Sequence, residues 1–148
     1  NLPGWSAAGL IALKREIRGG VIDFAISEHR APSVDYENAE QIAIGANSLC
    51  DISDSLMIQA EQMADASGVQ FEIYGKKIEH HPEFAELLQV AELLQVSVFD
   101  LILSGGEDHV FLATGTALNG FEIGKVHAGS GIRLSHLATP QPGWQHFS

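Results

Sequence analysis

The chain has 148 residues, 45% of them hydrophobic, and a formal net charge of −11, which is typical of one soluble globular domain with a core of its own. We expect no nucleic-acid partner, because so acidic a surface would repel the phosphate backbone of a nucleic acid. No apolar run approaches the roughly 20 residues that a bilayer span requires, which argues against a membrane protein.

The start of the chain and its single cysteine indicate the setting. The sequence opens at Asn1 rather than at methionine, so we expect a fragment of a longer protein. Cys50 is the only cysteine and permits no internal disulfide, which favours a reducing, cytoplasmic location. Because Leu49 and Ile52 stand beside it, we expect a buried rather than a reactive thiol.

Three helices are predicted before residue 46. The first opens at Ser6, its expected N-cap, and runs until the glycines at 19–20. Residues 21–28 carry apolar side chains at helical spacing and form the second. The third covers residues 36–45, with Asp35 as its cap.

An acidic turn follows a short extended run at residues 48–51 and leads into a helix from Leu56 to Gly68. Ser53 or Asp54 is the expected N-cap of that helix. Asp51 precedes the cap and gains little from the helix, so it requires another explanation. Clustered carboxylate and hydroxyl oxygens suit Mg²⁺, which shares its shell with waters and phosphates; an ordinary capped helix beside a solvated Asp51 is the alternative.

The second half of the chain predicts further strands and helices. Residues 69–74 alternate as a half-buried strand, Pro82 suits the first turn of the next helix, and residues 98–103 are apolar and helical. The rest is predicted as a strand at 110–113, a loop at 114–120 and a closing pair of strands at 121–126 and 132–134 joined by a turn. We expect one mixed β-sheet packed by helices, an α/β (α+β) fold.

The stretch Gly105-Gly106-Glu107-Asp108 precedes a strand, and a tail carries Trp144. Glycines let a backbone bend or approach a ligand, although a glycine pair before a strand is usually a turn with solvated acids. The P-loop, dinucleotide, zinc and nucleophile-elbow signatures are absent from the sequence.

Five stretches, in order, resemble thiamine-monophosphate kinases: residues 5–10, 51–56, 105–108, 123–126 and 143–147. The resemblance covers nearly the whole chain and corresponds to the C-terminal half of that family, whose fold is shared with aminoimidazole ribonucleotide synthetase. It implies that residues 1–148 form one C-terminal domain. It also implies that the N-terminal half, with further Mg²⁺ ligands and the homodimer interface, is absent from this chain.

The family implies an ATP- and Mg²⁺-dependent phosphorylation of thiamine monophosphate to thiamine diphosphate. By resemblance, Asp51 and Asp54 bind Mg²⁺, Ser53 contacts ATP, and Glu107 and Trp144 hold the substrate. A carboxylate and an indole face also suit a cationic thiazolium and a flat aminopyrimidine. We therefore expect these residues to border one common hollow.

The chain departs from the family pattern at three positions: Ser55 replaces a glycine, His109 a tyrosine and Gln145 an acid. Two alternatives stay open. The chain could belong to another enzyme of the same superfamily with a different phosphorylated substrate. It could also be a non-catalytic module that keeps this fold.

Overall fold

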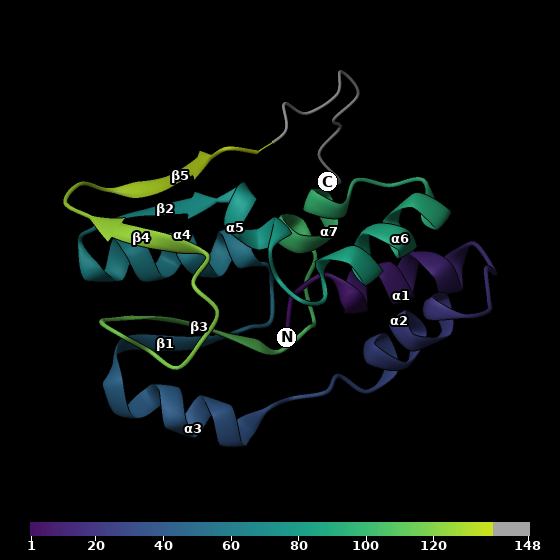
Figure 1. Ribbon diagram of the computed structural model, residues 1–148, viewed down its shortest axis with the longest axis horizontal. Coiled ribbons are helices and arrows are strands. Elements are labelled where there is room, and N and C mark those ends of the chain that lie inside the picture. The colour runs from purple at the N-terminus through teal and green to yellow at the C-terminus, as the bar shows by residue number, and fades with distance from the viewer. Residues whose placement is uncertain (138–148) are drawn as a thin grey trace.

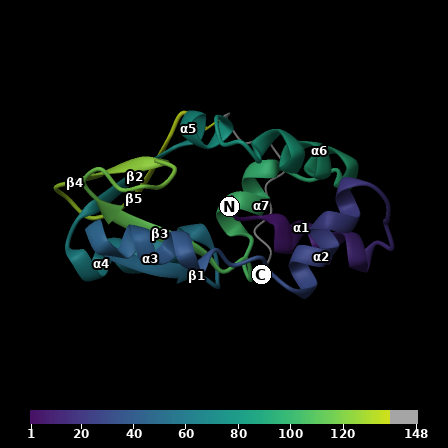
Figure 2. The ribbon, with the colours of Figure 1, turned by 60° about the horizontal axis from the view of Figure 1, so that its bottom comes forward.

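The computed structural model describes residues 1–137, and these form a helical part and a sheet part that lie side by side (Figure 1). Figure 2 shows the same division after rotation, with the N-terminus where the two parts meet. The helical part contains α1 (Trp5–Lys14), α2 (Val21–Arg30), α6 (Phe84–Leu94) and α7 (Val98–Ser104). The sheet part contains the strands with α3 (Tyr36–Gly45) and α4 (Leu56–Ser67), and α5 (Gly75–Glu79) leads from one part to the other.

The strands form two sheets. β1 (Ala46–Ile52) pairs antiparallel with β3 (Val110–Gly115), while β2 (Gln70–Tyr74) is the centre of a three-stranded sheet. Its neighbours are β4 (Gly124–His127), which is antiparallel to it, and β5 (Gly131–Ser135), which is parallel. The mixed α+β class is therefore confirmed, but the prediction of one sheet is wrong.

The predicted closing pair of strands is also wrong, because β4 and β5 lie on opposite edges of β2. A hairpin of β4 and β5 could pair with at most one edge of β2 and would leave its other edge open, and unpaired strand edges are a liability. Inserting β2 between them satisfies its backbone groups on both sides. Strand order of this kind is set by partners far apart in the chain.

Helix α4 packs against both sheets and so holds them together. Its buried stripe of Leu56, Ala60, Met63 and Ala64 is the predicted one. The helix ends as predicted at Gly68, whose left-handed backbone (φ 64°) closes the last turn. The first residues of α4 and the end of β1 therefore stand at a fixed place between the two sheets.

Other helix boundaries differ from the predictions. α1 begins at Trp5 with Gly4 at its N-cap, so Ser6 lies buried inside the first turn instead of capping it. α1 ends at Lys14, well before the glycines at 19–20, and α5 was not expected. α6 begins at Phe84, so Pro82 lies ahead of its first turn, whereas the Asp35 cap of α3 is confirmed by its hydrogen bond from the Asn38 N–H.

The membrane criterion gives a plain result for residues 1–137. No single helix there is both long and apolar enough to cross a bilayer. α6 and α7 reach that length and composition only as a pair bent by 111°. Several apolar residues of these two helices belong to the buried core: Leu87, Val90, Ala91, Leu94, Val98, Leu101, Ile102 and Leu103.

Candidate functional site

The acidic turn lies at the end of β1. Asp51 and Asp54 are both exposed, and the Asp51 side chain retains 51% of its accessible surface. The prediction that Ser53 or Asp54 caps α4 is wrong: the N-cap is Ser55, which is buried and accepts a hydrogen bond from the Ile58 N–H at 3.2 Å. The side chains of Asp51, Ser53 and Asp54 are therefore not needed to cap α4, and they are available to bind a ligand.

Ser53 is half-buried, and its hydroxyl lies 3.5 Å from the side-chain nitrogen of Gln59 on α4. At that distance the contact is weak. The hydroxyl can therefore turn to another partner at little cost.

The glycine-rich loop after α7 lies directly against the acidic turn. The Glu107 N–H donates to the Ser53 carbonyl at 2.7 Å, and the His109 N–H donates to the Ile52 carbonyl at 3.0 Å. These bonds extend the pairing of β1 with β3 beyond the last ladder pair, Ile52 with Val110. The structure thus brings together the two stretches that the sequence singled out separately.

Gly106 is the point of closest approach between them. A Cβ atom built there would stand 1.8 Å from the Asp54 carbonyl oxygen. Only glycine fits, so the glycine pair is more than an ordinary turn: it lets one backbone segment touch the other.

The residues after Gly106 point alternately out of and into the protein. Glu107 and His109 have left-handed backbones, with φ of 65° and 52°, and the Glu107 side chain is 74% exposed. Between them, Asp108 is buried and accepts hydrogen bonds from the N–H groups of Gly4 and Ser6, both at 2.9 Å. The expectation that both acids are solvated is therefore wrong for Asp108.

Asp108 caps the N-terminus of α1 by accepting hydrogen bonds from its free N–H groups, because the N-cap residue, Gly4, has no side chain that could accept them. A carboxylate at this end of a helix also meets the positive end of the helix dipole. Burial raises the pKa of Asp108, and the backbone hydrogen bonds from Ser6 and Gly4 oppose that shift. Asp108 therefore has a structural role: it anchors the glycine-rich loop after α7 to the helical part.

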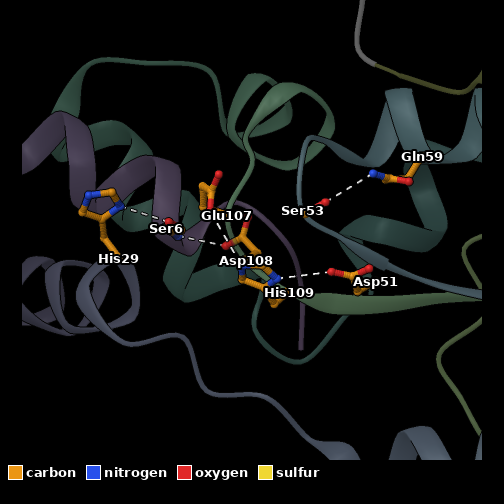
Figure 3. Close-up of polar contacts among 8 residues, drawn as sticks. All are labelled: Ser6, His29, Asp51, Ser53, Gln59, Glu107, Asp108 and His109. Atoms are coloured by element: carbon orange, nitrogen blue, oxygen red, sulfur yellow. Dashed lines mark hydrogen bonds and ion pairs between the residues drawn. The ribbon is translucent and has the colours of Figure 1, made fainter.

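His109 lies between two exposed carboxylates (Figure 3). Its Nδ1 is 3.3 Å from an Asp51 carboxylate oxygen, and its Nε2 is 3.6 Å from a Glu107 carboxylate oxygen. In the sequence, His109 stands out only as a departure from the family pattern, and its position between two carboxylates was not predicted. The available signal was its place directly after two acids and before a strand.

The acidic turn carries oxygen ligands of the kind that Mg²⁺, the metal implied by the resemblance, prefers. In the part of the chain that the structure describes, no group of three His, Cys, Asp or Glu side chains is arranged to hold a metal. Asp51 and Asp54 nevertheless supply hard oxygens on one exposed turn. Mg²⁺ is commonly held by one or two carboxylates with waters and substrate phosphates completing its shell, so these residues fit that mode.

A cavity lies between the two sheets. It has a volume of about 760 Å³ and is lined by residues of both sheets, among them Ile52, Phe71 and Val110. Asp51, Ser53, Asp54 and Glu107 do not line it, so the candidate site is a separate, open surface. Trp144, the remaining predicted substrate residue, lies outside the described residues, so the expectation of a common hollow stays a prediction.

No protein-family model matches the chain. The chain is 32% identical over 128 residues to the thiamine-monophosphate kinase of Aquifex aeolicus, which covers 82% of this chain and 41% of that protein. It is 38% identical over 136 residues to the thiamine-monophosphate kinase of Corynebacterium glutamicum, covering 83% and 38%. The chain therefore spans about two fifths of the length of these curated relatives.

Solved structures give the same result. The structure described as AaThiL complexed with AMPPCP and TMP matches with a TM-score of 0.81 and 31% identity, covering 99% of this chain and 49% of that one. The crystal structure of thiamine monophosphate kinase from Aquifex aeolicus matches with a TM-score of 0.79 and 28% identity, covering 93% and 49%.

The fold, with its acidic turn and glycine-linked loop, belongs to the class of α+β domains related to aminoimidazole ribonucleotide synthetase. Within that class, the chain is related over most of its length to the C-terminal part of the thiamine-monophosphate kinases. The resemblance drawn from the five sequence stretches is thus confirmed.

Proposed function

We propose that residues 1–148 form the C-terminal domain of a thiamine-monophosphate kinase. The complete protein would transfer the terminal phosphoryl group of ATP to thiamine monophosphate and yield thiamine diphosphate. The observation that carries this proposal is the direct contact between the acidic turn and the Glu107 loop, in a chain whose relatives and structural neighbours are thiamine-monophosphate kinases.

Asp51 and Asp54 are the proposed ligands of Mg²⁺. The chain carries a net charge of −11, so it would repel two phosphorylated substrates unless a cation offsets their charge. When bound, Mg²⁺ would neutralise phosphate charge and orient the phosphates. The chain's own contribution is to hold two carboxylates on a turn fixed by the Ser55 cap and by the Glu107 and His109 backbone bonds.

Ser53 and Glu107 are the proposed substrate contacts in the described part of the chain. The weakly engaged Ser53 hydroxyl can donate to an ATP phosphate oxygen. The exposed Glu107 carboxylate can pair with the cationic thiazolium, and Trp144 is proposed to stack on the substrate rings. Such a transfer requires positioning and charge compensation, with no covalent intermediate on the protein.

The complete protein is proposed to be a cytoplasmic homodimer that associates through an N-terminal half preceding this chain. That half would supply further Mg²⁺ ligands. The chain covers only about half of the matching structures, and this supports the existence of a further half in the complete protein. We therefore expect the 148-residue chain alone to bind the ligands weakly and not to turn over.

The test compares the complete gene product that contains this chain with the chain alone, each given ATP, Mg²⁺ and thiamine monophosphate. We expect thiamine diphosphate from the complete protein only. Asp51→Asn and Glu107→Gln should each lower kcat/KM at least tenfold, a loss of about 1.4 kcal/mol. The matched changes Asp65→Asn and Glu61→Gln, at exposed acids of α4, should have no effect.

Three results would contradict the proposal. Turnover by the chain alone would overturn the requirement for an N-terminal half. Thermal stabilisation of the complete protein by a purine ribonucleotide, and not by thiamine phosphates, would favour another enzyme of the superfamily. Absence of ATP consumption with thiamine monophosphate and Mg²⁺ would favour a non-catalytic module.

A further inference from the structure

His109 connects the two halves of the candidate site. Both of its ring nitrogens face a carboxylate, Asp51 on one side and Glu107 on the other. An ionised carboxylate only accepts hydrogen bonds, so Nδ1 donates to Asp51. Among residues 1–137, His109 is the only basic side chain within salt-bridge distance of either acid.

The backbone presents the imidazole at this place. His109 has φ 52°, a region that residues other than glycine and asparagine enter at a cost. Its N–H is fixed to the Ile52 carbonyl at 3.0 Å. The ring therefore projects from a residue that is tied to β1, one position from Asp51, and it does not depend on a mobile segment for its position.

We propose that His109 is a positioning residue that links Asp51 to Glu107, so that the metal-binding turn and the substrate-binding loop are held as one unit. This inference rests on the proposed function for the roles of the two acids. In its absence the two carboxylates would have no shared partner. Binding of the metal and of thiamine monophosphate would then weaken together.

The experiment replaces His109 in the complete gene product by Gly and by Asn, since both tolerate a left-handed backbone. The Asn amide can take the place of Nδ1 beside Asp51 but is too short to reach Glu107. The matched controls are His136→Gly and His136→Asn, because His136 has φ 56° and stacks on Tyr74, away from this site. Calorimetry measures the affinities for Mg²⁺ with the ATP analogue AMPPCP and for thiamine monophosphate.

We expect His109→Gly to weaken both affinities about two- to fivefold, which lies within the range for the loss of a single hydrogen bond. His109→Asn should restore the metal affinity and leave the affinity for thiamine monophosphate weakened. The His109→Gly effect on thiamine monophosphate should disappear in a Glu107→Gln background, because the link has already been lost there. The His136 controls should change neither affinity.

Three outcomes would overturn the inference: unchanged affinities in His109→Gly, equal loss of both affinities in the Gly and Asn variants, or a full His109→Gly effect in the Glu107→Gln background. A different result would refute the proposed function itself: the unmodified protein would not bind thiamine monophosphate. In that event the link is judged by the ¹⁵N shifts of His109 in histidine-labelled protein. Those shifts should respond to Asp51→Asn and to Glu107→Gln, and a lack of response to either would refute the link.

Discussion

The substitution Gly106→Ala tests whether the glycine loop really touches the acidic turn. The added Cβ would stand 1.8 Å from the Asp54 carbonyl oxygen, whereas such contacts do not come closer than 3.0 Å. The two backbone segments must therefore separate by more than an ångström. The groups in the way belong to backbone, so no side-chain rotation can relieve the overlap.

The cost follows from the hydrogen bonds that this separation breaks. The Glu107 N–H to Ser53 bond of 2.7 Å and the His109 N–H to Ile52 bond of 3.0 Å cannot both survive it. At about 1 kcal/mol for each bond, with further strain in the loop, we expect the free energy of unfolding to fall by about 2–4 kcal/mol.

Urea denaturation of the complete gene product, followed by circular dichroism, measures the effect. Gly45→Ala is the matched control, because a Cβ there would meet Leu118 at an ordinary 3.4 Å at the end of α3. That change should be neutral or stabilising by up to about 1 kcal/mol. If Gly106→Ala were as stable as Gly45→Ala, the close approach, and with it the proximity of the two stretches, would be refuted.

Three further predictions concern single side chains. Ser55→Ala removes the α4 cap and should cost about 1 kcal/mol of stability in urea denaturation, whereas Ser53→Ala should cost close to none but weaken ATP binding. Asp108→Asn should cost about 1–3 kcal/mol, because the Gly4 and Ser6 N–H groups lose part of their acceptor. The pKa of Asp108 is raised in the folded protein. The stabilisation that Asp108 provides is therefore complete below the unfolded pKa of about 3.9 and is lost as pH rises through the folded pKa. The loss of unfolding free energy in Asp108→Asn should accordingly be largest in acid. The hydrogen bond from the Ser135 hydroxyl, with smaller contributions from Tyr74, Arg133 and His127, lowers the pKa of Glu72. Glu72→Gln should therefore lower Tm at neutral pH. The stabilisation by ionised Glu72 is lost as pH falls through the folded pKa, so the Tm values of the variant and of the unmodified protein should converge in acid.

Each of these has an outcome that would contradict it. Equal stability loss in the two serine variants would show that Ser55 is not the cap. An Asp108→Asn deficit that grows with rising pH would reverse the assigned direction of the pKa shift. A Tm gap for Glu72→Gln that persists at the lowest pH would mean that charge is not its cause.

The elements that the sequence predicted well are those determined by near neighbours. Asp35 caps α3 because its side chain meets the Asn38 N–H three residues on. The α4 stripe and the Gly68 C-cap are equally local. The N-cap of α4 was misplaced because three consecutive residues, Ser53, Asp54 and Ser55, are all good caps, and local preference cannot choose among them.

The features that the sequence could not predict depend on distant partners. Asp108 is buried because it meets the N-terminus of α1 more than a hundred residues earlier in the chain. The central place of β2 depends on two strands that follow it by some fifty to sixty residues. The juxtaposition of the acidic turn and the Glu107 loop was expected from resemblance, but the backbone bonds that produce it have no signature in either stretch.

The short segment from Gly105 to His109 carries both the anchoring and the candidate chemistry because its side chains alternate in direction. Asp108 turns inward and ties the segment to the helical part, while the backbone of Glu107 and His109 ties it to β1 in the sheet part. Because the segment is attached to both parts, its backbone at Glu107 is fixed even though the Glu107 side chain is 74% exposed. A carboxylate whose backbone is already fixed has only its side-chain torsions to order when a ligand binds, and this reduces the entropic cost of binding.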